Sequence, residues 1–474
     1  MTRSAAARHP LRFCALATVL LAIGAAAPGE SQEAPDAGLP SSVERVARRI
    51  LAETGVPSAS IGVVQNGRVV LLKAYGNAKL QPPVPARPEM RYPIGSISKQ
   101  FTATAILLLA DERKLSLDDR VARFLPDLAH SGEVSIRQLL SHTSGYQDFW
   151  PQDYVPPFML KDVTAEQILD RWAKKPLDFP PGTQWQYSNT NFVIAGLIVE
   201  KISGLPLMQF LQEREFAPLG MRRVMSIDRE RLGDSDATGY LRYGLGPHRP
   251  APKEGKGWLF AMGELAMTAE DLAKWDIGLM EHRLLSPASY AEMEREVLLA
   301  NGLGAKYGLG IDVSAIAGHR ALSHGGEVSG FTATNIVFPD DRAAICVLTN
   351  QDAVGGSSKI AEEIAPKLFS SAAETAAAEA LARRVFESFQ AGRIDRSLFT
   401  ENANAYFDAT ALKDLASSLG PLGRPTGVEQ AAQRERGGMT FRRFKITFAK
   451  KKLEVAARLM PDGKIEQYQI TAGD

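Results

Sequence analysis

The chain has very little cysteine and no excess of charge of either sign. Of its 474 residues only Cys14 and Cys346 are cysteines, and Cys14 lies in an N-terminal segment that we expect to be removed, so the mature chain cannot form an internal disulfide. Its 55 basic and 54 acidic side chains give a formal net charge of +1, which argues against a nucleic-acid partner. Stability must therefore come from packing, and a chain of this length with 45% apolar residues is expected to form two or three folding units.

Beyond the N-terminus the sequence has no long hydrophobic run. The longest later runs, such as Phe192–Val199, have the length of core segments and not of membrane spans. The exception is the apolar run Phe13–Ala27, which follows three arginines and precedes the first acidic residue, Glu30. This order predicts a cleaved signal peptide over residues 1–30, and hence a periplasmic or secreted protein with no stable membrane anchor after cleavage near Ala26. An uncleaved anchor is the alternative, although the run is shorter than the roughly 20 residues of a comfortable span.

Strand patterns occur near both ends of the segment 40–370, with helical patterns between them. A hairpin is predicted from Ser58–Gln65 and Arg68–Tyr75, because Asn66-Gly67 suits the two positive-φ positions of a tight turn. Further strands are expected at Gly308–Val313, Arg320–His324, Ser329–Pro339 and Ala343–Asn350, and helices at Ser42–Leu51, Thr164–Ala173, Asn189–Ile202, Thr268–Leu279 and Ser358–Phe369. The pattern predicts an α/β (α+β) fold, in which helices flank one antiparallel sheet and an all-helical lobe is inserted.

A separate C-terminal unit is predicted over residues 378–474. Its helix runs to Gln390, and its strands are expected at Thr440–Phe448, Leu453–Leu459 and Ile465–Ile470. Pro461-Asp462-Gly463 marks the last hairpin turn. A small α+β accessory domain with a packing or substrate-gating role fits this pattern, because the segment carries no catalytic constellation.

The Ser-x-x-Lys pattern Ser96-Ile97-Ser98-Lys99 indicates a nucleophile and its base. If Ser96 opens a helix, Lys99 lies one turn further on the same face, where its amine can take the proton of the hydroxyl. The amide groups at the helix start can stabilise an oxyanion and lower the pKa of Lys99. The alternative makes Ser96 a simple N-cap and Lys99 a solvated side chain.

Two further motifs follow in order along the chain. Tyr187-Ser188-Asn189 offers a phenol, expected as tyrosinate, for a second base or a proton shuttle, and an amide that can donate to a substrate carbonyl. The alternative is that Tyr187 serves only in packing and Asn189 as a helix N-cap. The same Tyr-x-Asn pattern also occurs in Tyr75-Gly76-Asn77, at the expected end of a hairpin strand.

The third motif is His324-Gly325-Gly326 at the end of a predicted strand. Its glycines, Gly326 among them, let a substrate backbone approach the strand edge, and the backbone amide of Glu327 is a candidate second oxyanion donor. His324 is expected to position or protonate groups near Tyr187, although a lone histidine before glycine is more often structural.

Together these motifs resemble those of the serine β-lactamase superfamily, in the branch that holds class C β-lactamases, D,D-carboxypeptidases, D-aminopeptidases and β-lactamase-like esterases. The phrases Tyr92–Ser96, Leu139–Gly145 and Met267–Leu272 support the resemblance, which covers roughly residues 42–369. It implies that Ser96 is acylated, that Lys99 and Tyr187 share the proton transfers, and that Asn189 and His324 bind substrate.

One departure narrows the expected function. Class C β-lactamases have Lys-Thr-Gly where this chain has His324-Gly325-Gly326, so a cation for a β-lactam carboxylate is missing, and Glu327 would repel a carboxylate unless it points away. The prediction is therefore an exported serine hydrolase acting through an acyl-enzyme on a D-amino-acid peptide or a small acyl ester. A weak β-lactamase or penicillin-binding protein, and a non-catalytic protein that binds cell-wall fragments, are the alternatives.

No cofactor or metal is predicted. His142, in Leu139–Gly145, has no partner histidine or cysteine at ligand spacing, so we interpret it as part of a structural turn. The expected partner of the chain is a small-molecule or peptide substrate.

Overall fold

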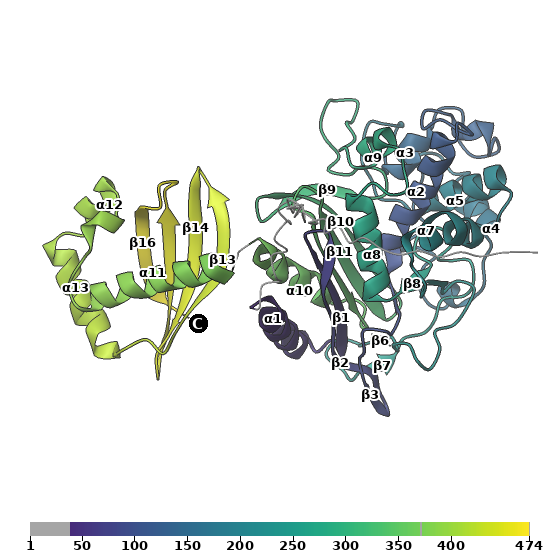
Figure 1. Cartoon of the computed structure of the whole chain (residues 1–474). Coiled ribbons are helices and arrows are strands. Elements are labelled where there is room, and N and C mark those ends of the chain that lie inside the picture. Colours follow the sequence, from purple (N-terminus) through teal and green to yellow (C-terminus); the bar gives the residue numbers. More distant parts are fainter. Residues whose placement is uncertain (1–37, 370–371, 474) are drawn as a thin grey trace, which may run out of the picture. The chain divides into compact units, whose positions relative to one another are not determined.

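The computed structural model describes residues 38–369 and 372–473, so the signal-peptide prediction for residues 1–30 lies outside the described residues. A seven-stranded antiparallel sheet with the order β3-β2-β1-β12-β11-β10-β9 forms the centre of the larger part (Figure 1). Its strands are β1 (Ser58–Gln65), β2 (Arg68–Leu80), β3 (Pro83–Pro85), β9 (Asp312–Ile316), β10 (His319–Val328), β11 (Phe331–Phe338) and β12 (Ala343–Thr349). Early and late segments thus share one sheet, which confirms the predicted fold class.

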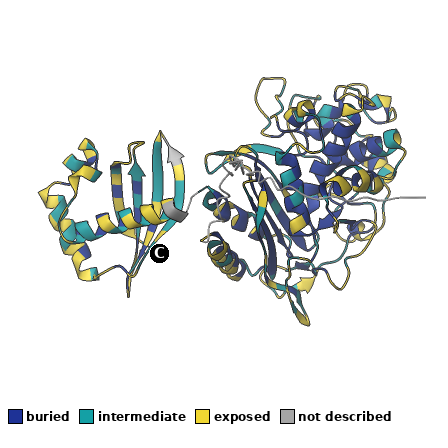
Figure 2. Ribbon diagram, in the orientation of Figure 1, coloured by how far each residue is buried: buried dark blue, intermediate teal, exposed yellow. Residues whose placement is uncertain are grey.

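Helices cover both faces of this sheet because the side chains of its central strands alternate between two hydrophobic cores. Ile345 and Val347 of β12 belong to a core shared with α1 (Leu39–Thr54) and α10 (Gly356–Ile364). Cys346 of the same strand belongs to the larger core, which includes α2 (Ser98–Asp111) and α8 (Ala269–Met280). Strands β1 and β12 are consequently buried along nearly their whole length (Figure 2).

The hairpin forms at the predicted turn, where Asn66 and Gly67 have φ values of 52° and 71°. Strand β2 continues to Leu80 because its last residues pair with β3, so Tyr75-Gly76-Asn77 lies within the strand and not at its end. The strand expected at Gly308–Val313 instead begins at Asp312, since Gly310 has a φ of 76° and residues 308–311 form a turn.

The inserted lobe surrounds α2 and carries the other helices of this part. They are α3 (Ile136–Leu140), α4 (Ala165–Trp172), α5 (Asn189–Ser203), α6 (Leu207–Leu211), α7 (Ala217–Leu219) and α9 (Pro287–Met293). The lobe also contains short strands that the sequence did not indicate. Strand β8 (Leu265–Met267) pairs with β4 (Tyr92–Pro93) on one side and with β5 (Met225–Ser226) on the other, and β6 (Tyr240–Leu241) pairs with β7 (Arg249–Pro250).

The C-terminal part has three helices and a four-stranded antiparallel sheet of its own. Its elements are α11 (Ala372–Gln390), α12 (Glu401–Tyr406), α13 (Ala409–Leu419), β13 (Gly427–Arg436), β14 (Met439–Thr447), β15 (Lys452–Leu459) and β16 (Ile465–Ala472). Phe386, Phe389 and Val455 are among the residues of its separate core. The helices α12 and α13 and the strand β13 were not predicted, and the domain limits 40–370 and 378–474 stay a prediction.

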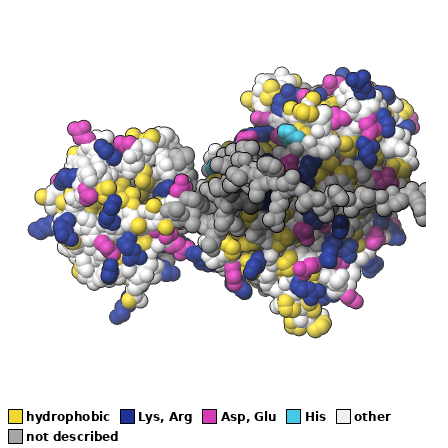
Figure 3. Space-filling view, in the orientation of Figure 1, with side chains coloured by type: hydrophobic (Ala, Val, Ile, Leu, Met, Phe, Trp, Pro, Cys, Tyr) yellow, Lys and Arg dark blue, Asp and Glu magenta, His cyan; other side chains and the backbone are white. Residues whose placement is uncertain are grey.

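Two further properties of the fold are the distribution of charge on its surface and the length of its apolar helices. Basic and acidic side chains are interspersed on the face drawn in Figure 3. Among residues 38–369 and 372–473, no single helix is long and apolar enough to cross a membrane, and only the bent pair Asn189–Ser203 with Leu207–Leu219 meets those criteria together. The first helix of that pair, α5, is largely buried in the core.

Candidate active site

Ser96 lies in a 3-10 turn, Gly95–Ile97, that leads directly into α2. It is half-buried, whereas its neighbours on both sides are buried. Gly95 has a φ of 52°, and a Cβ at this position would lie 2.5 Å from the backbone nitrogen of Glu327. The turn therefore requires glycine before Ser96 and brings the serine against strand β10.

Lys99 is completely buried beside the serine, so the alternative of a solvated lysine is wrong. Its Nζ donates to Ser96 Oγ at 3.0 Å, to Asn189 Oδ1 at 2.8 Å and to the backbone oxygen of Met262 at 2.9 Å. Burial lowers the pKa of Lys99 to about 7, and the charge of Asp148 partly opposes that shift. Lys99 therefore changes from ammonium to neutral amine near neutral pH, as a general base for the Ser96 proton must.

Tyr187 packs on the other side of Lys99, whose Nζ lies 4.9 Å from the centre of the phenol ring. Its hydroxyl is buried and makes no hydrogen bond within the described residues, although the nearby Ser96 side chain acts to lower its pKa. Burial dominates and raises the pKa of Tyr187 strongly. The expected tyrosinate is therefore corrected: Tyr187 is a neutral phenol, suited to relay a proton, and Lys99 is the base.

Asn189 is the first residue of α5 and lies between Lys99 and the carboxylate of Asp148, a residue that no sequence motif indicated. Its side-chain nitrogen donates to Asp148 Oδ2 at 3.2 Å, and its backbone nitrogen donates to Asp148 Oδ1 at 2.9 Å. A carboxamide has two N–H donors, so one remains for a substrate carbonyl.

His324 is buried on β10, and its two ring nitrogens already have partners. Nδ1 donates to the backbone oxygen of Gly325, and Nε2 accepts from the Tyr307 hydroxyl at 2.9 Å, which assigns the tautomer. Burial and the nearby charge of Lys99 lower the pKa of His324 to about 4. The ring is therefore neutral and positions its neighbours, including the Tyr187 ring 6.2 Å away, in place of the predicted proton donation.

The edge of β10 next to Ser96 is free to receive a substrate backbone. Strand β9 pairs with residues 319–323, and within residues 38–369 and 372–473 no strand pairs with residues 324–328 on that side. A Cβ on Gly326 would lie 1.8 Å from the backbone oxygen of Ile94 and 3.2 Å from the nitrogen of Ser96. The backbone nitrogens of Ser96 and Glu327 therefore lie in neighbouring segments that pack closely, which keeps both as candidate oxyanion donors. The Glu327 carboxylate accepts from the Ala353 nitrogen at 2.8 Å.

His142 lies next to Tyr187, a contact that the sequence did not predict. Its ring packs against that of Tyr187 with 4.2 Å between centres and an angle of 33° between planes, and its Nδ1 accepts from the Ser188 nitrogen at 3.2 Å. Within residues 38–369 and 372–473, no group of three or more histidine, cysteine or carboxylate side chains is placed to hold a metal. His142 therefore packs against Tyr187 and accepts a hydrogen bond from the segment that carries it.

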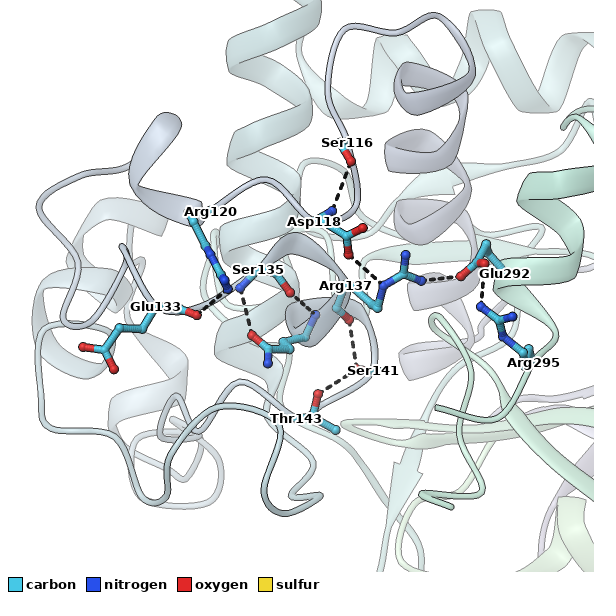
Figure 4. A network of polar contacts seen from close by, with 11 residues as sticks. Ser116, Asp118, Arg120, Glu133, Ser135, Arg137, Ser141, Thr143, Glu292 and Arg295 are labelled. Atoms are coloured by element: carbon cyan, nitrogen blue, oxygen red, sulfur yellow. Dashed lines mark hydrogen bonds and ion pairs between the residues drawn. The ribbon is translucent and has the colours of Figure 1, made fainter. Parts of the chain in front are cut away.

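A polar network fixes the helix that precedes His142 (Figure 4). Arg137 of α3 donates from Nε to Asp118 at 3.1 Å and also bonds Glu292 on α9. The Ser141 hydroxyl donates to the Arg137 backbone oxygen at 2.9 Å and lies 2.9 Å from the Thr143 hydroxyl. These contacts connect α3 to α9 and to the turn that carries His142, which packs against Tyr187.

A cleft of about 980 Å³ opens over Ser96. Trp150, Tyr154, Val155 and Met159 form an apolar wall, and Trp150 and Val155 are exposed. Glu327 and Asp352 are also among the residues that line the cleft, and none of its described lining residues is lysine or arginine. The cleft thus suits a substrate with an apolar group and a neutral or cationic end.

At this cleft a serine contacts a buried lysine, beside a tyrosine and two backbone amides, and this combination of groups is suited to nucleophilic catalysis by the serine. The chain belongs to the β-lactamase family, whose model, described as "Beta-lactamase", matches residues 43–365. It is a serine hydrolase of that family with relatives of the D-peptidase and amidase type.

Three known proteins show how far this similarity extends. The D-aminopeptidase of Brucella anthropi is 30% identical over 327 residues, which cover 68% of this chain but only 61% of that relative. The D-amino acid amidase of Ochrobactrum anthropi SV3, solved with L-phenylalanine amide, has a TM-score of 0.62, 24% identity and coverage of 70% and 97% of the two chains. The penicillin-binding protein homologue of Pyrococcus abyssi, with a TM-score of 0.61 and 22% identity, covers 92% of this chain and 96% of its own.

Proposed function

We propose that this chain hydrolyses amides of D-amino acids, or peptides that begin with a D-residue, through an acyl-enzyme on Ser96. The observation that carries the proposal is the 3.0 Å contact between Lys99 Nζ and Ser96 Oγ at a cleft whose described lining residues include Glu327 and Asp352 and no lysine or arginine. A free ammonium group on the substrate is compatible with that charge. The preference for the D configuration rests on the similarity to D-aminopeptidases.

The site residues supply each step of the reaction. Neutral Lys99 accepts the Ser96 proton while Oγ bonds to the substrate carbonyl carbon, and the new oxyanion lies between the amides of Ser96 and Glu327. Tyr187 relays the proton from Lys99 to the departing amine as the C–N bond breaks. Water then attacks the acyl-enzyme, and its proton returns to Ser96 as the acid product leaves.

The alternatives differ in the charge of the substrate. A β-lactam or a peptide with a C-terminal D-alanine carries a carboxylate, which Glu327 and Asp352 would repel. A small acyl ester is neutral and fits the apolar wall, so it is the second candidate. A protein that only binds cell-wall fragments has no need of the contact between Lys99 and Ser96.

A matched set of substrates tests the proposal. D-alanine p-nitroanilide is expected to be hydrolysed at least about tenfold better in kcat/KM than its L enantiomer and than its N-acetylated form, which lacks the ammonium group. A neutral p-nitrophenyl ester and a chromogenic cephalosporin complete the panel. Preference for the cephalosporin or for the N-acetylated amide would refute the proposed substrate class.

We also propose that the chain is exported, on the basis of the arginines and the apolar run in its first thirty residues. Expression of the full chain in a Gram-negative host is expected to give a periplasmic protein whose N-terminus, read by mass spectrometry, lies close to Ala26. Replacement of the three arginines by glutamate serves as the control and should retain the protein in the cytoplasm. Full-length wild type found only in the cytoplasm would contradict export.

A further inference from the structure

We infer that Asp148 is a positioning residue of the acylation step: it holds the Asn189 carboxamide with its oxygen on Lys99, and its negative charge acts on the lysine. The inference rests on the acyl-transfer chemistry proposed above, but it does not depend on which substrate the chain hydrolyses. Asp148 lies in the segment between α3 and α4 and touches neither Ser96 nor Lys99 in any contact recorded among the described residues.

The first argument is the geometry of the clamp. Asp148 Oδ1 accepts from the backbone nitrogen of Asn189 at 2.9 Å, and Oδ2 accepts from the side-chain nitrogen of the same residue at 3.2 Å. Oδ1 also accepts from the nitrogen of Trp150 at 3.3 Å. The carboxylate thus joins the wall of the cleft to the start of the catalytic helix α5.

The second argument is the orientation of the amide. An asparagine side chain has nearly the same shape when its oxygen and nitrogen are exchanged, so its neighbours decide which way it faces. In the observed orientation the oxygen of Asn189 accepts from Lys99 Nζ at 2.8 Å, and its nitrogen faces the carboxylate. In the reverse orientation the Asn189 nitrogen would face the Lys99 amine, donor against donor, and the Asn189 oxygen would face the Asp148 carboxylate, acceptor against acceptor. The carboxylate therefore excludes that orientation.

The third argument is the balance of charge around Lys99. His142 and His324 face the lysine and are neutral, because burial and the lysine charge lower their pKa values. Tyr187 keeps its proton, and the charge of Asp312 on β9 raises the pKa of Tyr187 further. Asp148 is the carboxylate whose charge raises the pKa of Lys99 against the effect of burial, and the lysine in turn lowers the pKa of Asp148, which burial raises to about 6.

A simpler role for Asp148 leads to different expectations. Ser188, at the N-cap of α5, makes no capping hydrogen bond with its side chain, so Asp148 also satisfies an amide at that helix start. If capping were its only role, Asp148→Asn would reduce stability and leave the ionisation of Lys99 unchanged. A positioning role requires that the pH dependence of acylation change as well.

The experiment measures the rate of Ser96 modification by a fluorophosphonate as a function of pH. Oγ displaces fluoride from phosphorus and loses its proton to Lys99, so the wild-type rate should rise with pH through a midpoint near the Lys99 pKa of about 7. In Asp148→Asn the ammonium loses an attracting charge. The midpoint should therefore fall by on the order of one pH unit, and the plateau rate by about tenfold, as the amide loses its fixed orientation.

Two further variants complete the test. Asp148→Glu keeps the charge but displaces it by one methylene, so its midpoint should match wild type while its plateau rate falls. Asp178→Asn is the matched control, because Asp178 accepts from Gln186 at 2.6 Å and lies outside the contacts of Lys99, and it should leave both quantities unchanged.

A folded Asp148→Asn protein with the wild-type midpoint would overturn the inference. If that variant does not fold, a Glu variant with an unreduced plateau rate would overturn it instead. Failure of the proposed substrate class is a separate result, since it would show as absent hydrolysis of D-amides by wild type while fluorophosphonate labelling continued.

Discussion

Ser96→Ala is expected to lower kcat/KM for the best substrate by at least about 10⁴-fold, with the fold unchanged. The alanine side chain lacks the hydroxyl oxygen that Lys99 Nζ contacts at 3.0 Å, and the proposed acyl-enzyme cannot form without it. Steady-state kinetics on the wild type and the variant, with circular dichroism to compare their folds, measure the effect.

The matched control is Ser98→Ala, two residues further along the chain. Ser98 is also buried, but its hydroxyl accepts from the backbone nitrogen of Leu265 at 3.1 Å and takes no part in the chemistry. This variant should lose some stability, about 1 kcal/mol for one hydrogen bond, and keep its turnover. Equal activity of Ser96→Ala and Ser98→Ala would show that another residue is the nucleophile.

Gly326→Ala should reduce kcat/KM by about 10²- to 10³-fold, the range expected when an oxyanion donor is lost. The added Cβ would lie 1.8 Å from the backbone oxygen of Ile94, a distance that no side-chain rotation relieves. Strand β10 must then move away from the turn that carries Ser96, and the amide of Glu327 moves with it. Active-site titration will show whether the lost activity reflects slower acylation.

Gly325→Ala supplies the control on the same strand. A Cβ at Gly325 would meet only the backbone oxygen of Ala333, at 4.0 Å, which is an ordinary contact. Its kcat/KM should stay within about tenfold of wild type, because nothing near Ser96 has to shift. If the two alanine variants lost the same activity, close packing of β10 against the Ser96 turn would not be the cause.

Local spacing was enough to predict the nucleophile and its base. Ser96 and Lys99 are three residues apart, so helical geometry alone puts them on one side of the chain. The alternation of apolar residues likewise predicted most strands of the central sheet. Tyr187 and His324 became candidates through their order along the chain, and the structure places both rings near Lys99 and Ser96.

Residues whose role depends on distant contacts were not predictable in this way. Asp148 and Asn189 are 41 positions apart and meet only because the lobe folds the segment after α3 onto the start of α5. Burial raises the pKa of Tyr187 and so keeps its phenol protonated, and the extent of burial depends on how the whole core packs. Strand β13 has few β-branched residues in the sequence Gly427–Arg436, and its pairing with β14 makes it a strand.

The central claim is that Ser96 forms the covalent intermediate. Its most direct test is peptide mass spectrometry of the full chain after reaction with a fluorophosphonate near pH 8, where Lys99 is mostly neutral. We predict a single phosphonyl adduct on Ser96, absent from Ser96→Ala. A folded protein that carries the adduct on another residue, or carries none, would contradict the account.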